Sequence, residues 1–165
     1  MPFTKWRQFM VGQGKGRAAH SGVWKRSTTA VGNVGAGVDD LMSFTLEADG
    51  LYKLDQGIRI IAAGISGADG NNKEVVLLFG GTSIFTTGVV TDNDKKWFIE
   101  AHVFRTGADT QLAYAWGIAD ATVKAVTRTA LTKDDGAAII VKCTGETTDT
   151  DMIIQQLGII EALTV

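Results

Sequence analysis

Short apolar runs of strand length alternate along the chain with clusters of Gly, Asn and Asp. From 97 to 103 every odd position is apolar, whereas Glu100 and His102 lie between them, so one face of this segment is predicted to be buried in a sheet. No segment has the periodicity of a long amphipathic helix. We predict strands at 38–46, 57–65, 74–79, 83–87, 97–105, 110–116, 122–129, 137–143 and 152–163.

The composition favours the same fold class. Twenty glycines stand against one proline in 165 residues, and glycine adopts the positive φ angles of tight turns without steric cost. We predict an all-β, jelly-roll-like two-sheet β-sandwich with an extended N-terminal arm. Its predicted core includes Phe44, Leu46, Ile60, Leu78, Phe79, Ile99, Val103, Ile140 and Ile154.

The charge divides the chain into two parts. Six of its sixteen basic residues precede the first acidic residue, Asp39. The chain from Asp39 onward contains the other ten basic residues and all eighteen acidic residues, which gives it a net charge of −8. We predict a basic, Gly-rich N-terminal arm over 1–37 and a jelly-roll β-sandwich domain over 38–165, although 21–31 is compatible with one strand.

Several of these segments resemble jelly-roll virion structural proteins of tailed bacteriophages, of the head decoration, head fibre and tail fibre type. The resembling segments are DLMSFTL (40–46), GIRI (57–60), LLFGGT (77–82), WFIEAHVFRTG (97–107), VKCTG (141–145) and DMI (151–153). The resemblance implies a homotrimer that binds a capsid or tail surface. Apolar residues on both phases of 58–61 and 75–79 also favour oligomerisation, because such strands need cover on both faces.

The basic arm is the predicted attachment site. Its positive charges can steer association with an acidic capsid or a neighbouring subunit, and its aromatic residues can anchor the contact by apolar burial. The predicted partner-binding residues are Phe3, Lys5, Trp6, Arg7, Phe9, Lys15, Arg17, Trp24, Lys25 and Arg26. We do not expect a nucleic-acid partner, because the basic residues are spaced by Gly and Ala and an exterior virion protein does not meet the genome.

The sequence offers few candidates for chemistry. Residues 12–17 lack the Lys-Ser/Thr ending and the strand–helix context of a phosphate-binding loop. His20 and His102, the only histidines, have no zinc-ligand spacing around them. Cys143 is in phase with Ile139 and Val141, which predicts a buried thiol. We therefore expect no enzyme, no cofactor and no bound metal.

Three other groups of residues have alternative interpretations. Segments 92–94 and 149–151 contain oxygen ligands suitable for Ca²⁺, but turn and capping roles are favoured. Carboxylates at Asp39, Asp40, Glu100 and Glu161 have no strand phase that makes any two a glycosidase pair. For Trp97, Tyr114 and Trp116 we favour core packing over a sugar-binding platform, with a contact surface as a further alternative for Tyr114 and Trp116.

The sequence thus predicts a non-enzymatic virion structural protein, a capsid decoration (cement) or head-fibre protein that stabilises the particle surface as an oligomer. The major capsid protein or another virion protein is the expected partner. A carbohydrate-binding tail fibre or receptor-binding adhesin is the alternative. With a single cysteine, no signal-peptide pattern and no apolar run of membrane-spanning length, we expect synthesis in the host cytoplasm and no membrane partner.

Overall fold

The computed structural model describes residues 22–91 and 95–163. The regular elements of this part of the chain are all β-strands. They are β1 (Gly22–Ser27), β2 (Val31–Gly32), β3 (Gly37–Leu46), β4 (Gly57–Ser66), β5 (Glu74–Phe79), β6 (Thr82–Thr86), β7 (Lys96–Gly107), β8 (Thr110–Ala119), β9 (Thr122–Leu131), β10 (Ile139–Thr147) and β11 (Ile153–Leu163).

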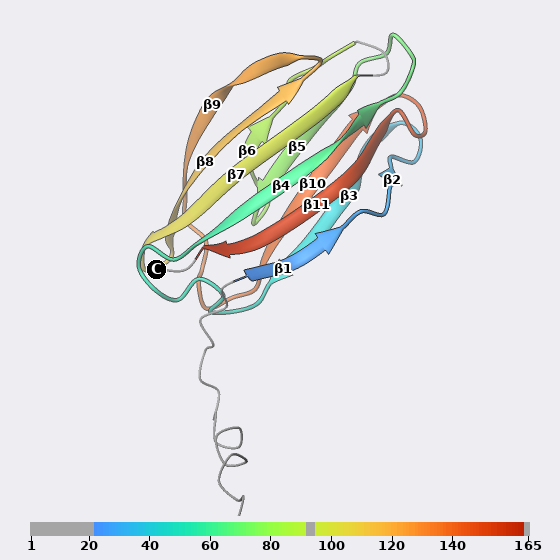
Figure 1. Ribbon diagram of the computed structural model, residues 1–165. Coiled ribbons are helices and arrows are strands. Elements are labelled where there is room, and N and C mark those ends of the chain that lie inside the picture. Colours follow the sequence, from blue (N-terminus) through green and yellow to red (C-terminus); the bar gives the residue numbers. More distant parts are fainter. Residues whose placement is uncertain (1–21, 92–94, 164–165) are drawn as a thin grey trace, which may run out of the picture.

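The strands form two antiparallel sheets that are stacked as layers (Figure 1). The large sheet has the order β1-β11-β4-β7-β8-β9, with β2 also paired to β11, and the small sheet has the order β3-β10-β5-β6. The chain passes repeatedly from one sheet to the other, so that β3 pairs with β10 and β4 with β11 across long sequence separations. The predicted jelly-roll-like β-sandwich is confirmed.

The core lies between the inward faces of the two sheets. In β7 the odd-numbered residues Trp97, Ile99, Ala101 and Val103 are buried, as the alternation predicts. Antiparallel partners share a face, so the alternation of β7 continues into β4 and β8 and gives one continuous layer. The largest fully buried apolar side chains are Phe79, Phe85, Leu51, Ile58, Ile60, Leu77, Ile84, Ile99, Ile153 and Ile160.

The predicted core is partly wrong. Leu46, Ile60, Phe79, Ile99 and Val103 are buried, and Phe44 is half-buried against the core. Ile140 is 44% exposed, because its neighbours Ile139 and Val141 take the inward positions of β10. Leu78 and Ile154 lie on outward phases as well and are only half-buried.

The predicted boundary between arm and domain is also wrong. β1 and β2 both pair with β11, so the strands between Gly22 and Gly32 belong to the large sheet. Asn33 is fully buried, and its side chain donates to Asp149 O (2.6 Å) and accepts from the Ile153 backbone N–H (2.9 Å). Such contacts tie this segment to the β10–β11 connection. Of the predicted arm 1–37, the part from Gly22 onward thus belongs to the folded domain, and residues 1–21 lie outside the described residues.

Candidate interaction surface

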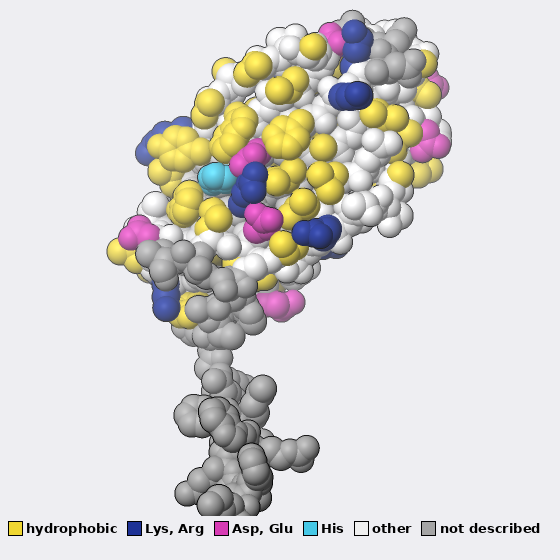
Figure 2. Space-filling view, in the orientation of Figure 1, with side chains coloured by type: hydrophobic (Ala, Val, Ile, Leu, Met, Phe, Trp, Pro, Cys, Tyr) yellow, Lys and Arg dark blue, Asp and Glu magenta, His cyan; other side chains and the backbone are white. Residues whose placement is uncertain are grey.

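The face of the large sheet that points away from the core carries many apolar side chains. Across β11, β4, β7 and β8, the strand register places these outward residues side by side. They are Ile61, Ala63, Ile65, Phe98, Phe104, Leu112, Tyr114, Trp116, Ile118, Leu157 and Ile159. An antiparallel sheet with one solvated face normally places polar residues there. This surface, which we call the outer face of the large sheet, is therefore more apolar than a solvated sheet face normally is (Figure 2).

A small charged group interrupts this apolar face, and we call it the Arg59 cluster (Arg59, Glu100, His102 and Glu161). Arg59 Nε donates to Glu100 Oε1 at 2.8 Å, and Arg59 Nη1 lies 3.4 Å from Glu161 Oε2. His102 Nε2 lies 3.1 Å from the same Glu100 oxygen. Figure 2 shows charged side chains surrounded by hydrophobic ones on this face.

The two glutamates of the Arg59 cluster differ in how firmly they are held. The Glu100 side chain is only 13% exposed, and the hydrogen bond from Arg59 lowers the pKa of its carboxyl group, with a smaller contribution from His102. The Glu161 side chain is 29% exposed and its contact with Arg59 is longer. Glu161 is therefore the carboxylate better placed to accept a further donor.

The aromatic residues of this face are outside the core. The His102 ring packs edge-on against Trp116, with 5.2 Å between ring centroids, and against Phe104 at 6.2 Å. Tyr114 is opposite His102 in the register and is 40% exposed. Trp97 is buried, as predicted, but core packing of Tyr114 and Trp116 is wrong, because the inward positions of β8 are filled by small residues such as Ala113 and Ala115.

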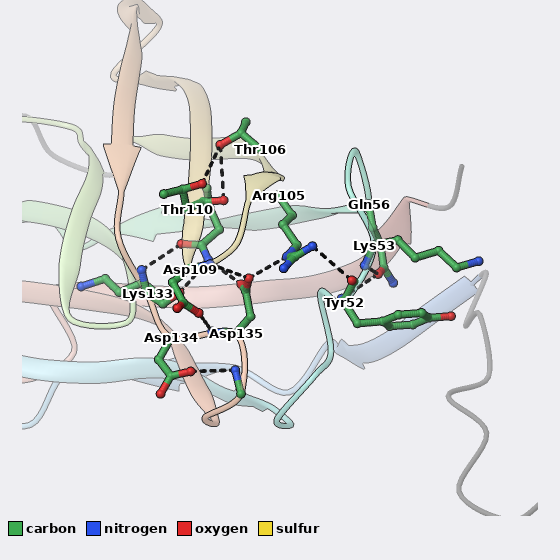
Figure 3. A network of polar contacts seen from close by, with 12 residues as sticks. Tyr52, Lys53, Gln56, Arg105, Thr106, Asp109, Thr110, Lys133, Asp134 and Asp135 are labelled. Carbon is green, nitrogen blue, oxygen red and sulfur yellow. Dashed lines mark hydrogen bonds and ion pairs between the residues drawn. The ribbon is translucent and has the colours of Figure 1, made fainter.

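A network of polar contacts closes one end of the sandwich (Figure 3). At its centre is the nearly buried carboxylate of Asp135. Asp135 Oδ2 accepts from Arg105 Nε (2.6 Å) and from the Asp109 backbone N–H (2.9 Å), and Oδ1 accepts from Gln111 Nε2 (2.6 Å). The Gln111 Oε1 atom accepts from the Lys133 backbone N–H at 3.1 Å. The enclosed charge thus has an opposite charge and two neutral donors around it, as a buried carboxylate requires.

The same network fastens the β3–β4 loop. Arg105 Nη1 donates to Tyr52 O at 3.1 Å, and the Asp49 backbone N–H donates to Asp135 O at 2.7 Å. Gln56 Oε1 accepts from the backbone N–H of Tyr52 at 3.0 Å. Both carboxylate oxygens of Asp135 are engaged by donors from β7, from β8 and from the turn between them, so the arrangement is suited to holding the β9–β10 connection against these strands.

The outer face of the small sheet is hollowed. A groove of about 530 Å³ has Leu78 and Ile140 among its lining residues, together with the side chains of Lys133 and Lys142. Lys142 Nζ lies 2.6 Å from Asp40 Oδ2, so one of the two ammonium groups is already paired. None of the described residues that line the groove is aromatic, so these residues offer no flat stacking surface of the kind that a sugar site uses.

Of the predicted partner-binding residues, only three fall within the described part of the chain, and all three are in β1. Trp24 packs against the core and stacks on Phe44 with 6.5 Å between ring centroids. Lys25 Nζ donates to Ser43 O at 2.8 Å, whereas Arg26 is exposed. The Trp24 ring is thus used, at least on one face, within the fold. Phe3, Lys5, Trp6, Arg7, Phe9, Lys15 and Arg17 lie outside the described residues.

The other residues considered for catalysis or metal binding lie, where they are described, in surroundings that favour a structural role. Cys143 is fully buried, and burial raises the pKa of its thiol, so the reactive thiolate is disfavoured. Asp149 Oδ2 accepts from Asn71 Nδ2 at 2.7 Å, and Thr150 Oγ1 accepts from the Gly35 backbone N–H at 2.9 Å, which agrees with turn and capping roles. Segment 92–94 and His20 lie outside the described residues. Within 22–91 and 95–163, no group of three or more His, Cys, Asp or Glu residues is arranged to hold a metal ion.

No protein-family model matches the chain, and none of the curated proteins matches it significantly. Among the described residues there is no helix long and apolar enough to cross a membrane. The function of this chain therefore has to be inferred from the geometry of its two sheet faces and of the loop network.

Proposed function

We propose that the protein is a non-enzymatic structural component of a tailed-bacteriophage particle, a capsid decoration (cement) or head-fibre protein that acts as a homotrimer on the particle surface. The outer face of the large sheet is the observation that carries this proposal. A single sandwich has no need of an apolar second face, whereas a subunit of an assembly needs one. The partner of the assembled protein is the major capsid protein or another virion protein.

The polar groups of the described residues support a structural role over catalysis. A general acid for glycoside hydrolysis needs a raised pKa, whereas Arg59 lowers the pKa of Glu100. Asp135 and Glu100 both form ion pairs with arginine side chains. These carboxylates therefore stabilise the fold and its surface.

Attachment to the particle is assigned to the N-terminal segment 1–21. It contains Lys5, Arg7, Lys15 and Arg17 and no acidic residue, together with Phe3, Trp6 and Phe9. Because β1 begins at Gly22, a variant starting at Gly22 keeps the whole sheet, whereas removal of residues 1–26 would also remove most of β1. The shorter deletion is therefore the appropriate test of attachment.

The proposal is tested by fractionating particles on a density gradient and probing each fraction with an antibody to the protein. Co-migration of the protein with the particle band is expected. Purified full-length protein should bind to particles that lack it, and the variant starting at Gly22 should fold but bind more weakly. Protein found only in the particle-free fractions, with no binding upon addition, would refute the proposal.

A carbohydrate-binding adhesin is the alternative function, and one observation favours it. Tyr114 and Trp116 lie on the same outward side of β8, and aromatic faces stack on sugar rings. Binding of the full-length protein to a glycan array, lost in the variant Trp116→Ala, would support this alternative. The structural proposal predicts no glycan binding.

A further inference from the structure

Charge is distributed unequally between the two sheets. The strands of the large sheet contain only two acidic residues, Glu100 and Glu161. The basic residues of the same strands are Lys25, Arg26, Arg59, Lys96, Arg105, Lys124 and Arg128. The small sheet has the opposite balance, and its charged strand residues are Asp39, Asp40, Glu74, Lys142 and Glu146. An acidic domain thus has one sheet with an excess of positive charge.

Three of these basic residues, which we call the rim cations, lie at the border of the outer face of the large sheet. Arg26 is on the edge strand β1, Arg128 is on the opposite edge strand β9, and Lys96 is at the start of β7. The register places all three at outward positions, and all three are exposed. Figure 2 shows Lys and Arg side chains at separate places around the hydrophobic ones.

The rim cations have no carboxylate to pair with on their own face. Glu100 and Glu161 are both paired with Arg59. None of the rim cations forms an ion pair with a described residue. Between them lie apolar side chains that are open to solvent, such as Tyr114 and Ile118, which are 40% and 41% exposed. An apolar centre within a polar rim is the anatomy of a protein interface, and here the rim requires a partner with carboxylates.

The charge pattern argues against two other occupants of this face. The same face of a second copy would bring rim cations together and would supply no unpaired carboxylate. A nucleic acid would bring phosphates towards Glu100 and Glu161, which lie among the apolar side chains of the face. An acidic protein surface avoids both repulsions, because its carboxylates meet the rim while its apolar residues meet the centre.

We propose that the outer face of the large sheet docks on an acidic surface of another virion protein, with the rim cations paired to carboxylates of that surface. The small sheet then points away from the particle, because an acidic partner repels its excess of acidic residues. Segment 1–21 precedes β1, an edge strand of the large sheet, so the face and this segment contact the same partner from one side of the domain. This inference deepens the proposed function and rests on it for the identity of the partner as a virion protein.

The charge requirement is tested with particles that lack the protein. Purified full-length protein is sedimented with these particles at low and at physiological ionic strength, and the dissociation constant is measured. A triple variant, Arg26→Gln, Lys96→Gln and Arg128→Gln, should raise the dissociation constant by about tenfold at low ionic strength. The difference from the wild type should shrink as salt is added, because screening weakens exposed ion pairs.

A second triple variant is the control for net charge. Lys53→Gln, Lys133→Gln and Lys142→Gln remove the same number of charges from the β3–β4 loop, the β9–β10 connection and the small sheet. This control should bind within about twofold of the wild type, because these cations lie outside the proposed contact. Equal weakening by the two triple variants would reduce the effect to net charge and would overturn the inference.

The orientation of the domain is tested by a matched pair of substitutions. Ile118 on the outer face of the large sheet and Ile140 on the outer face of the small sheet are the same residue type and are 41% and 44% exposed. Ile118→Glu should raise the dissociation constant by about tenfold or more, since it places an acid against an acidic partner, whereas Ile140→Glu should leave it unchanged. Equal effects, or a larger effect of Ile140→Glu, would overturn the inference. Thermal unfolding of both variants confirms that each one folds.

The remaining outcomes separate this inference from the proposed function. Wild-type protein that does not bind the particles would refute the proposed function and, with it, this inference. Wild-type protein that binds, together with rim-cation and Ile118→Glu variants that bind equally well, would refute this inference alone. In light scattering the rim-cation variant should have the mass of the wild type, and a smaller mass would assign the face to contacts between copies instead. Binding of single-stranded DNA by the wild type but not by the rim-cation variant would assign the face to nucleic acid and would also overturn the inference.

Discussion

Replacing Asp135 with Asn keeps the shape of the side chain but removes its charge and replaces one acceptor oxygen with a donor. In the wild type all three side-chain contacts of Asp135 are with donors: Arg105 Nε, Gln111 Nε2 and the Asp109 backbone N–H. Whichever way the new amide is turned, its NH₂ group faces at least one of these donors. The variant therefore loses at least one short hydrogen bond and leaves the guanidinium of Arg105 without its counter-charge.

The expected loss of stability depends on how far the Arg105–Asp135 ion pair is shielded from solvent. The side chains of Arg105 and Asp135 are 18% and 8% exposed, so solvent screens their interaction only in part. Breaking a fully buried ion pair costs about 3–5 kcal/mol, and discounting for this partial exposure gives about 2–4 kcal/mol for the Asn variant. For a chain of this length, that loss lowers the midpoint of thermal unfolding by about 6–12 °C.

Asp134→Asn is the matched control for this substitution. It makes the same chemical change one residue earlier, on an exposed side chain whose Oδ1 accepts from the Gly136 backbone N–H. Thermal unfolding followed by circular dichroism should show almost no shift for this control. Both variants must be compared at one protein concentration, because oligomerisation couples stability to concentration. A shift for Asp135→Asn equal to that of the control would refute the assigned role of the network.

Three further substitutions have defined outcomes. Ile99→Ala empties a fully buried position and should lower the free energy of unfolding by about 2–5 kcal/mol in a urea titration. Gly64→Ala should cost about 1–3 kcal/mol in the same assay, because the added Cβ would collide with Ile154 O and lie 2.7 Å from the Trp97 ring, whereas Gly70→Ala meets open space and should be neutral. Glu100→Gln should flatten the acid limb of a stability–pH curve: the folded-state pKa of Glu100 is lowered, so its contribution is complete above the ordinary glutamate pKa of 4.5 and is lost as pH falls through the folded value. An unchanged acid limb would contradict that role.

The alternation of apolar and polar residues was sufficient to predict the all-β fold and most strands. The strand at 74–79 coincides with β5, and 57–65 differs from β4 by one residue. The predicted end of a strand was wrong where the backbone pairing continues through small residues. β8 extends to Ala119 because Gly117 and Ala119 pair with β9 and β7 even though they are small residues.

The N-terminal strands were harder to predict because their stabilisation is tertiary. β2 is two residues long and depends on pairing with β11 and on the buried Asn33 side chain. Similarly, the strand phase of Glu100 and Glu161 did not indicate that these two carboxylates lie close together. Arg59, on the outward phase between Ile58 and Ile60, was the available signal, but only the register of β11, β4 and β7 brings the three side chains together.

The most direct test of the structural role is electron cryomicroscopy of the virus particle with and without this protein. Particles that contain the protein should show additional surface density of threefold symmetry, with a volume that accommodates three chains of 17.5 kDa. This density should be absent from particles made without the protein and should return when the purified protein is added. Identical reconstructions from the two kinds of particle would contradict the account.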